Sequence, residues 1–222
     1  MPDATDSPSP SPDGQPADAR ERARLCDLLL ELGPDAPTLC EGWATLDLAA
    51  HLVVRETDPR AGLAILGGGR FAGLESRLMD GAKARGLDAL VERLRGGPPL
   101  VPWRLPGLRR PLNLNEWFVH HEDVRRANGR EPREDAALDA ELWGLLRPFS
   151  RVMLGRVRGA AVTLVAPGHG TIGPRGRGPA AELTGGPQEL VLYLFGRRNA
   201  ARVELSGDPE AVRAVSSAKL GI

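Results

Sequence analysis

The stretch LNLNEWFVHHEDVRRA, residues 112–127, predicts a helix that carries chemical groups on its inward face. Glu116 and His120 are four residues apart, so on a helix they lie one turn apart on one side. A helical wheel places both in an apolar stripe with Val119 and Ala127, the face expected to pack inward. A buried carboxylate must be paired, protonated or metal-bound. The spacing leaves two readings open: a metal or catalytic role, or a buried Glu–His pair that satisfies itself.

A second stretch, WATLDLAAH at residues 43–51, ends in another histidine. It predicts a helix over 46–56, capped by Thr45, that is apolar almost all round except for a stripe of Asp47, His51 and Arg55. This stripe is either the solvated edge of a buried helix or the lining of a polar internal cavity, in which Asp47 orients His51. Spacing alone favours the solvated edge.

Together the two stretches supply a candidate set of three metal ligands, His51, Glu116 and His120. Three protein ligands with one vacant position are typical of a catalytic zinc site, whereas structural zinc sites have four protein ligands. The chain has four histidines, and three of them lie in these stretches. His121 points away from the stripe and is either a partner of a ligand or a surface residue. His169 lies in a glycine-rich turn and is expected to be exposed.

The overall composition argues against several classes of protein. Among 222 residues, Lys+Arg and Asp+Glu both number 29, so no basic excess indicates nucleic-acid binding. No apolar run reaches the ~18 residues that span a membrane, and no secretory signal is visible, which predicts a cytoplasmic protein. Two cysteines are too few for a disulfide framework. Cys26 is expected to be buried; Cys40 is a reactive thiol or a packed, inert cysteine, and packing is favoured.

The order of elements predicts a helical bundle followed by a small α+β module. A Pro- and Ser-rich tail over 1–16 is expected to be disordered, a helical domain covers 17–157, and an α+β domain covers 158–222. The helices are expected at 18–32, 46–56, 60–66, 74–95 with a break at Gly86, 112–127 and 136–157, with a Pro-rich crossover loop over 97–111. Beyond Gly159, strands are expected at 161–165, near 171, at 181–184 and 201–205. Helices are expected over 187–197 and after Asp208, which is expected to cap the last one.

Three motifs carry a resemblance to a known family: LCEGW at 39–43, DLAAHL at 47–52 and EWFVHHEDVRR at 116–126. The chain resembles the actinobacterial mycothiol-dependent maleylpyruvate isomerase-like proteins, which belong to the DinB-like metalloenzymes. FVHHEDVRR is similar to an uncharacterised metal-binding subgroup. The segment PQELVLYLFGRRNAARVELSGDPEAV resembles the small C-terminal domain of many members and, distantly, a sterol-carrier-like module.

The resemblance implies a mainly α fold, a DinB-like four-helix bundle with a long crossover, followed by the small α+β module. It implies that a divalent metal, usually zinc, is bound by His51, Glu116 and His120. It therefore favours the cavity reading of the stripe on helix 46–56. Residues specific for maleylpyruvate do not carry over to this sequence.

The expected function is that of a divalent-metal-binding, mycothiol-dependent enzyme of the thiol S-transferase or isomerase type. A low-molecular-weight thiol such as mycothiol would occupy the vacant metal position and attack an electrophilic substrate. Arg55, Arg125 or the C-terminal module would bind the anionic cofactor. The protein is expected to be a monomer or homodimer. The alternative is a non-catalytic protein that binds a metal or a small molecule, and a third reading is a vestigial site in a bundle that mediates association.

Overall fold

The computed structural model describes residues 14–58, 72–97 and 106–221. Most of the tail expected over 1–16, the helix expected over 60–66 and most of the expected crossover loop lie outside the described residues. The chain forms two compact units: one is Asp18–Arg133, and the other begins at Glu134 and includes the N-terminal residues up to Ala17. This division falls before the last helix of the helical domain expected over 17–157.

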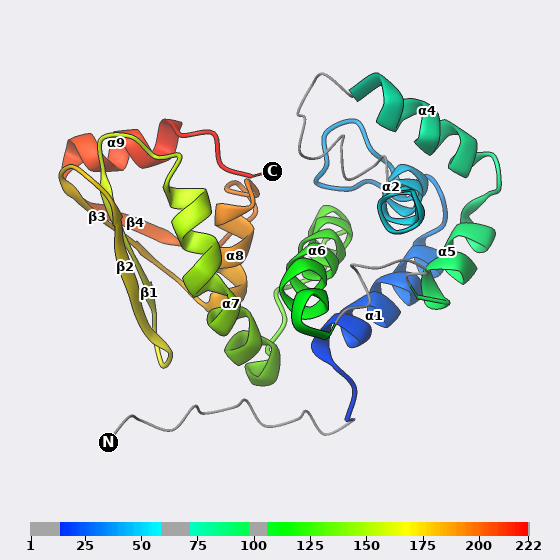
Figure 1. Ribbon diagram of the computed structural model, residues 1–222, viewed down its shortest axis with the longest axis horizontal. Coiled ribbons are helices and arrows are strands. Elements are labelled where there is room, and N and C mark those ends of the chain that lie inside the picture. Colours follow the sequence, from blue (N-terminus) through cyan, green and yellow to red (C-terminus); the bar gives the residue numbers. More distant parts are fainter. Residues whose placement is uncertain (1–13, 59–71, 98–105, 222) are drawn as a thin grey trace. The chain divides into compact units, whose positions relative to one another are not determined.

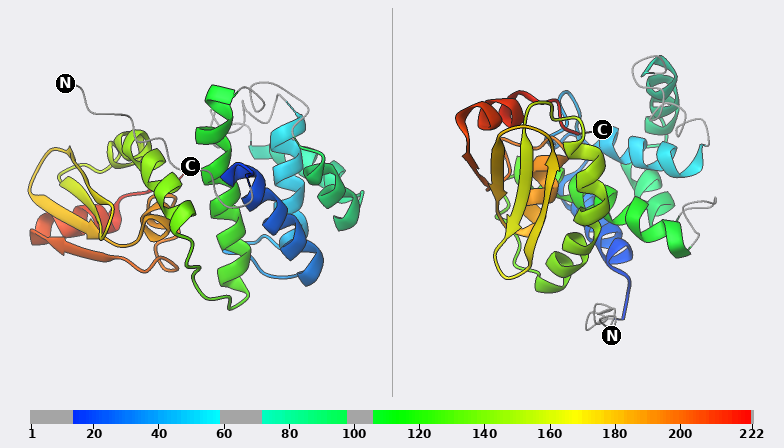
Figure 2. Two further views of the ribbon diagram at one scale, coloured as in Figure 1. Left: turned by 90° about the horizontal axis from the view of Figure 1, so that it is seen from below. Right: turned by 60° about the vertical axis from the view of Figure 1, so that its left-hand side comes forward.

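The unit that spans Asp18–Arg133 is entirely helical in its described elements (Figure 1). Its helices are α1 (Ala17–Leu32), α2 (Thr45–Thr57), α4 (Ala72–Lys83), α5 (Leu87–Arg95) and α6 (Pro106–Ala127). All five contribute to one apolar core, with Leu25, Leu52, Leu90 and Trp117 almost completely buried. The left view of Figure 2 shows α2 and α6 with their axes roughly aligned and α1 beside them. This packing brings α2 and α6 together although a long stretch of sequence separates them.

Local sequence signals explain where these helices begin and end. Gly33 has φ 78°, and its N–H donates to the Leu29 carbonyl, which ends α1. Gly86, also at φ 78°, separates α4 from α5, so the expected break there is confirmed. Helix α6 begins at Pro106, earlier than the expected start at 112, because proline suits the first turn of a helix.

The start of α2 differs from expectation in its capping residue. Thr45 was expected to cap this helix, but it is the first helical residue and its hydroxyl donates to the Gly33 carbonyl. Asp47 instead accepts a 3.0 Å hydrogen bond from the backbone N–H of Ala44. The cap therefore comes from the third residue of the helix, whose carboxylate reaches back over the first turn.

The second unit packs helices against a four-stranded sheet. Its elements are α7 (Ala136–Leu154), β1 (Ala161–Ala166), β2 (Gly170–Gly176), β3 (Ala180–Thr184), α8 (Pro187–Leu194), β4 (Glu204–Gly207) and α9 (Pro209–Ser217). The strand order is β2-β1-β3-β4, with β1 and β3 parallel and the other pairs antiparallel. Alternation along β1 buries Val162, Leu164 and Ala166, and α7 and α8 lie on one side of the sheet (Figure 1).

The expected fold class is confirmed: the chain is mainly helical and carries a small α+β module at its C-terminal end. Asp208 caps α9 as expected, accepting from the N–H groups of Glu210 and Ala211. Across residues 14–58, 72–97 and 106–221, no helix combines the length and apolar character needed to cross a membrane.

Candidate metal centre

Three side chains from two helices converge in the helical unit. His51 lies near the middle of α2, and Glu116 and His120 lie one turn apart on α6. The His51 and His120 Nε2 atoms are 3.5 Å and 3.3 Å from Glu116 Oε1, and all three donor atoms lie within 4.8 Å of one another. The structure therefore brings together the three residues that the sequence analysis predicted as metal ligands.

The spacing of these atoms fits a tetrahedral cation. Zinc bonds to nitrogen and carboxylate oxygen are about 2.0–2.2 Å long, which places neighbouring ligand atoms of a tetrahedron about 3.3–3.6 Å apart. The His51–Glu116 and His120–Glu116 separations match these edges. Among the described residues, no fourth His, Cys, Asp or Glu donor joins this group. The set can therefore hold a divalent ion with a coordination position left for an exogenous ligand.

Glu116 is held as a carboxylate by its surroundings. Burial raises its pKa, but the Arg55 guanidinium, the two histidines and their hydrogen bonds outweigh burial and hold the pKa well below its usual range. The Arg55 Nε lies 3.2 Å from Glu116 Oε1. An ionised carboxylate is the form that coordinates a metal, so this oxygen is ready to act as a ligand.

The far side of the His120 ring faces a second carboxylate. His120 Nδ1 donates to Asp123 Oδ2 at 2.9 Å, and the Cys40 thiol donates to the same oxygen at 3.2 Å. Burial lowers the pKa of His120, but the hydrogen bonds to Asp123, Cys40 and Glu116 raise it well above its ordinary value. Because Asp123 holds a proton on Nδ1, the Nε2 lone pair is the one left for a metal once Nε2 is deprotonated.

The loop before α2 is tied to α6, and this places Cys40. The Leu39 N–H donates to the Asp123 carbonyl at 3.1 Å. Within the loop, Thr38 Oγ1 accepts from the Cys40 N–H and donates to the Trp43 carbonyl. The LCEGW motif therefore forms a closed turn whose thiol is fixed beside Asp123.

The stripe on α2 is not a solvated edge at His51 and Arg55. The Arg55 residue is 6% exposed, and the His51 ring lies 5.1 Å from the Trp43 ring and 5.4 Å from the His120 ring, centroid to centroid. In the cavity reading Asp47 orients His51, but in the structure its carboxylate instead caps α2 and accepts from Lys83 Nζ at 3.0 Å. The Trp43 ring packs against the His51 ring, whereas the Asp47 carboxylate of α2 is engaged elsewhere.

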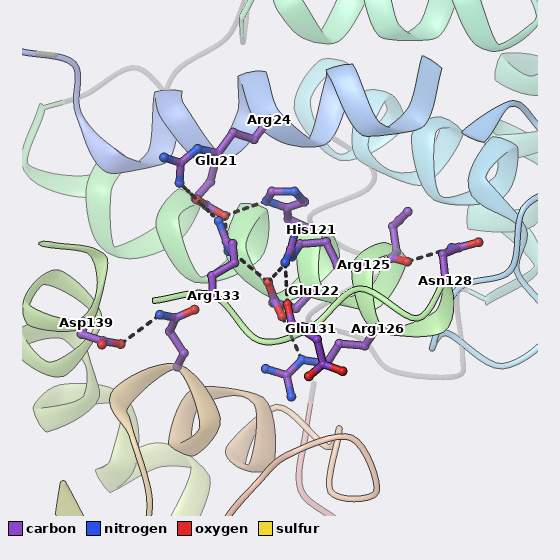
Figure 3. A network of polar contacts seen from close by, with 12 residues as sticks. Glu21, Arg24, His121, Glu122, Arg125, Arg126, Asn128, Glu131, Arg133 and Asp139 are labelled. Atoms are coloured by element: carbon purple, nitrogen blue, oxygen red, sulfur yellow. Dashed lines mark hydrogen bonds and ion pairs between the residues drawn. The ribbon is translucent and has the colours of Figure 1, made fainter. Parts of the chain in front are cut away.

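His121 and Arg125 face a different part of the unit, the buried ionic network drawn in Figure 3. His121 Nδ1 lies 2.9 Å from Glu21 Oε2, and Arg133 donates to both carboxylate oxygens of Glu21. Arg125 donates to Glu122 Oε1 and to the Glu131 carbonyl. The structure brings Arg55 to the candidate metal centre but does not bring Arg125 there.

Asp123 and Cys40 were not among the predicted site residues. Asp123 follows His120 by three residues, which is a spacing that places two side chains on the same helical face. This spacing was visible in the sequence. The proximity of Cys40 to Asp123 was not visible in the sequence, because it depends on the path of a loop that lies 83 residues from Asp123 along the chain.

Comparison with known proteins supports the fold. No family model matches the chain, and no curated protein matches it. Among solved structures, the crystal structure of a mycothiol-dependent maleylpyruvate isomerase matches with a TM-score of 0.56 and 15% identity, covering 89% of this chain and 97% of the other. A histidine-to-alanine mutant of the mycothiol-dependent maleylpyruvate isomerase matches with a TM-score of 0.54 and 16% identity over the same shares. At this identity the match shows that the chain shares the fold of that enzyme.

Proposed function

We propose that this chain is a divalent-metal-dependent enzyme that uses a low-molecular-weight thiol, with His51, Glu116 and His120 as the metal ligands. The observation that carries the proposal is the spacing of their donor atoms, at 3.3 Å and 3.5 Å around Glu116 Oε1. The metal is proposed to be zinc, since two imidazoles and one carboxylate form a ligand set found in catalytic zinc sites.

The likeness in fold suggests which thiol to test. The solved structures with this fold are described as mycothiol-dependent. We therefore propose mycothiol as the thiol, which fits a cytoplasmic protein because thiols are kept reduced in that compartment. The partners are then this thiol and a small electrophilic substrate.

The chemistry divides between the cation and the protein. A divalent cation in this set would act as a Lewis acid that lowers the pKa of a coordinated thiol. Asp123 fixes the tautomer of His120, and the Trp43 ring packs on His51, so both imidazoles are held in place. Arg55, beside Glu116, adds a positive charge that favours an anionic ligand near the site.

The proposed reaction adds the thiol across a double bond of the electrophilic substrate. Sulfur bonds to one carbon, the π bond breaks, and the thiol proton ends on the neighbouring atom. If the new single bond rotates before sulfur leaves and the neighbouring atom loses a proton, the double bond re-forms and the product is a geometric isomer; if sulfur stays, the product is a thiol conjugate. The protein is accordingly proposed to be an isomerase or a thiol S-transferase.

Metal analysis of the purified protein tests the ligand set. About one divalent ion per chain is expected in the wild type, and it should be lost in Glu116→Gln and His120→Ala, because two ligands bind far more weakly than three. His169→Ala is the matched control, because His169 lies in the other compact unit. Equal metal content in all four proteins would refute the assignment.

A spectroscopic experiment tests the thiol. In the cobalt-substituted protein, mycothiol should produce a sulfur-to-cobalt charge-transfer absorption that strengthens as pH rises through the pKa of the bound thiol, which should lie below the free value of ~8.5. The absorption should be absent in His51→Ala. A cobalt spectrum that does not change when mycothiol or other small thiols are added would favour the alternative, a non-catalytic metal-binding or small-molecule-binding protein.

A further inference from the structure

The second nitrogen of the His120 ring belongs to another group of potential ligand atoms. Cys40 Sγ, His120 Nδ1 and Asp123 Oδ2 lie within 4.8 Å of one another. Asp123 Oδ2 is 2.9 Å from the nitrogen and 3.2 Å from the sulfur, and the nitrogen and sulfur are 4.0 Å apart. Sulfur, nitrogen and oxygen donors thus surround one small volume on the side of His120 that faces away from Glu116.

This group is buried and held by the backbone. Asp123 is fully buried, His120 is 8% exposed and Cys40 is half-buried. The hydrogen bond from the Leu39 N–H to the Asp123 carbonyl fixes the loop that carries Cys40 against α6. The three donors therefore do not have to be gathered from mobile surface side chains when a ligand arrives.

We propose that Cys40 Sγ, His120 Nδ1 and Asp123 Oδ2 form a second cation-binding set, which takes a thiophilic divalent ion of the cadmium class. A thiolate ligand selects soft ions over hard ones. For zinc, bonds of about 2.3 Å to sulfur and 2.0–2.2 Å to nitrogen or oxygen give tetrahedral edges of about 3.3–3.7 Å. The observed distances between the three donor atoms are both shorter and longer than these values. Side-chain shifts of a few tenths of an ångström would therefore bring the three atoms to coordination distances.

Charge also distinguishes the two sets. A cation in the second set would meet a thiolate and a carboxylate, whose two negative charges neutralise a divalent ion. The first set offers the single carboxylate of Glu116, and the Arg55 guanidinium lies 3.2 Å from its oxygen. Opposite charges at these distances attract strongly in a buried site, so a thiophilic dication has an electrostatic reason to prefer the second set.

The two sets share one imidazole and therefore compete. When an ion binds the second set, it displaces the Cys40 proton and the His120 Nδ1 proton, and the proton that remains on the ring is on Nε2. A protonated Nε2 has no lone pair for an ion held by His51 and Glu116. Occupation of the second set would then weaken metal binding in the first and inhibit the enzyme; this consequence rests on the proposed function, whereas the second set itself does not.

Cadmium titration of the metal-free protein tests the second set. Binding should produce a sulfur-to-cadmium charge-transfer absorption that saturates near one equivalent in the wild type. Cys40→Ser should abolish it. Cys26→Ser is the matched control and should leave it unchanged, because Cys26 is fully buried in the apolar core and belongs to neither set. His51→Ala should also keep the absorption, since His51 belongs only to the first set.

Further variants separate loss of the set from loss of the fold. Asp123→Asn keeps the thiol but removes one ligand charge, and its cadmium affinity should fall at least about tenfold. Cys40→Ser should retain the circular dichroism spectrum of the wild type, which excludes unfolding as the cause. An absorption that persists in Cys40→Ser, or one that disappears in Cys26→Ser, would overturn the proposal.

Competition with cobalt tests the coupling. Cadmium should bleach the visible cobalt spectrum of the wild type but not that of Cys40→Ser. Displacement of cobalt to the same extent in both proteins would refute the shared-histidine coupling. If the wild type takes up no cobalt, the proposed function fails, while the cadmium absorption still reports on the second set independently.

Discussion

The imidazole of His120 donates from Nδ1 to the fully buried Oδ2 of Asp123 at 2.9 Å, and the two residues lie on the same face of α6. This contact fixes which ring nitrogen faces Glu116. A histidine held in this way by a carboxylate is a better-oriented and more basic metal ligand than a free one. Asp123 is therefore expected to influence the candidate metal centre without touching the ion.

Asp123→Asn should weaken metal binding by about 10–100-fold while leaving the fold intact. An amide can still contact Nδ1–H, but it lacks the negative charge that makes the imidazole more basic. The affinity is measured by competition with a chromophoric chelator. Asp88→Asn, an exposed position on α5, is the matched control. Unchanged affinity in Asp123→Asn would show that this carboxylate does not support the metal.

Arg55→Met should strengthen metal binding by about tenfold. The guanidinium lies 3.2 Å from Glu116 Oε1, so it repels a cation held by that oxygen, and methionine keeps the buried apolar stem without the charge. The same change should weaken binding of an anionic ligand to the loaded protein. Isothermal titration with metal and then with azide measures both effects. Weaker metal binding in Arg55→Met would instead mean that Arg55 chiefly positions Glu116.

Glu21→Gln should destabilise the protein at neutral pH by about 3 kcal/mol. Burial raises the pKa of Glu21, but hydrogen bonds from His121 and Arg133 and the Arg133 charge outweigh it and lower the pKa from 4.5 to about 2. Because the folded pKa is depressed, this stabilisation is present above pH 4.5 and is lost as pH falls towards 2. Urea unfolding should show that the difference in free energy of unfolding between the wild type and Glu21→Gln is smaller at pH 3.5 than at pH 7.

Glu31→Gln is the control for that experiment. Glu31 pairs with Arg130, but its side chain is 57% exposed, so its removal should cost less than about 1 kcal/mol. A difference in free energy of unfolding between wild type and Glu21→Gln that grows on acidification would contradict the lowered pKa of Glu21.

Asp47→Ala should destabilise the protein by about 1 kcal/mol and leave metal binding unchanged. The change removes the acceptor for the Ala44 N–H at the start of α2 and the ion pair with Lys83. Lys83→Met keeps the cap and removes the ion pairs of Lys83 with Asp47 and Asp80, which are partly exposed, so it should cost less. Chemical unfolding together with metal analysis checks both statements. Loss of metal in Asp47→Ala would restore the earlier reading in which Asp47 orients His51.

The sequence by itself determined the pairing of Glu116 with His120. Residues four positions apart in a helix lie about one turn apart on the same face. The proximity of Glu116 and His120 therefore follows from helical geometry and needs no tertiary contact. The apolar stripe around them likewise indicated that this face is buried. The break at Gly86 and the Asp208 cap were also readable, because each depends on the conformational preferences of one or two neighbouring residues.

Only the tertiary structure decided what surrounds that pair. His51 approaches Glu116 because α2 and α6 pack in one core, and spacing alone had favoured a solvated edge. Cys40 reaches Asp123 because a backbone hydrogen bond from Leu39 ties a loop to α6. Such contacts join segments more than sixty residues apart, and their free energy comes from burial and hydrogen bonding that no local pattern encodes.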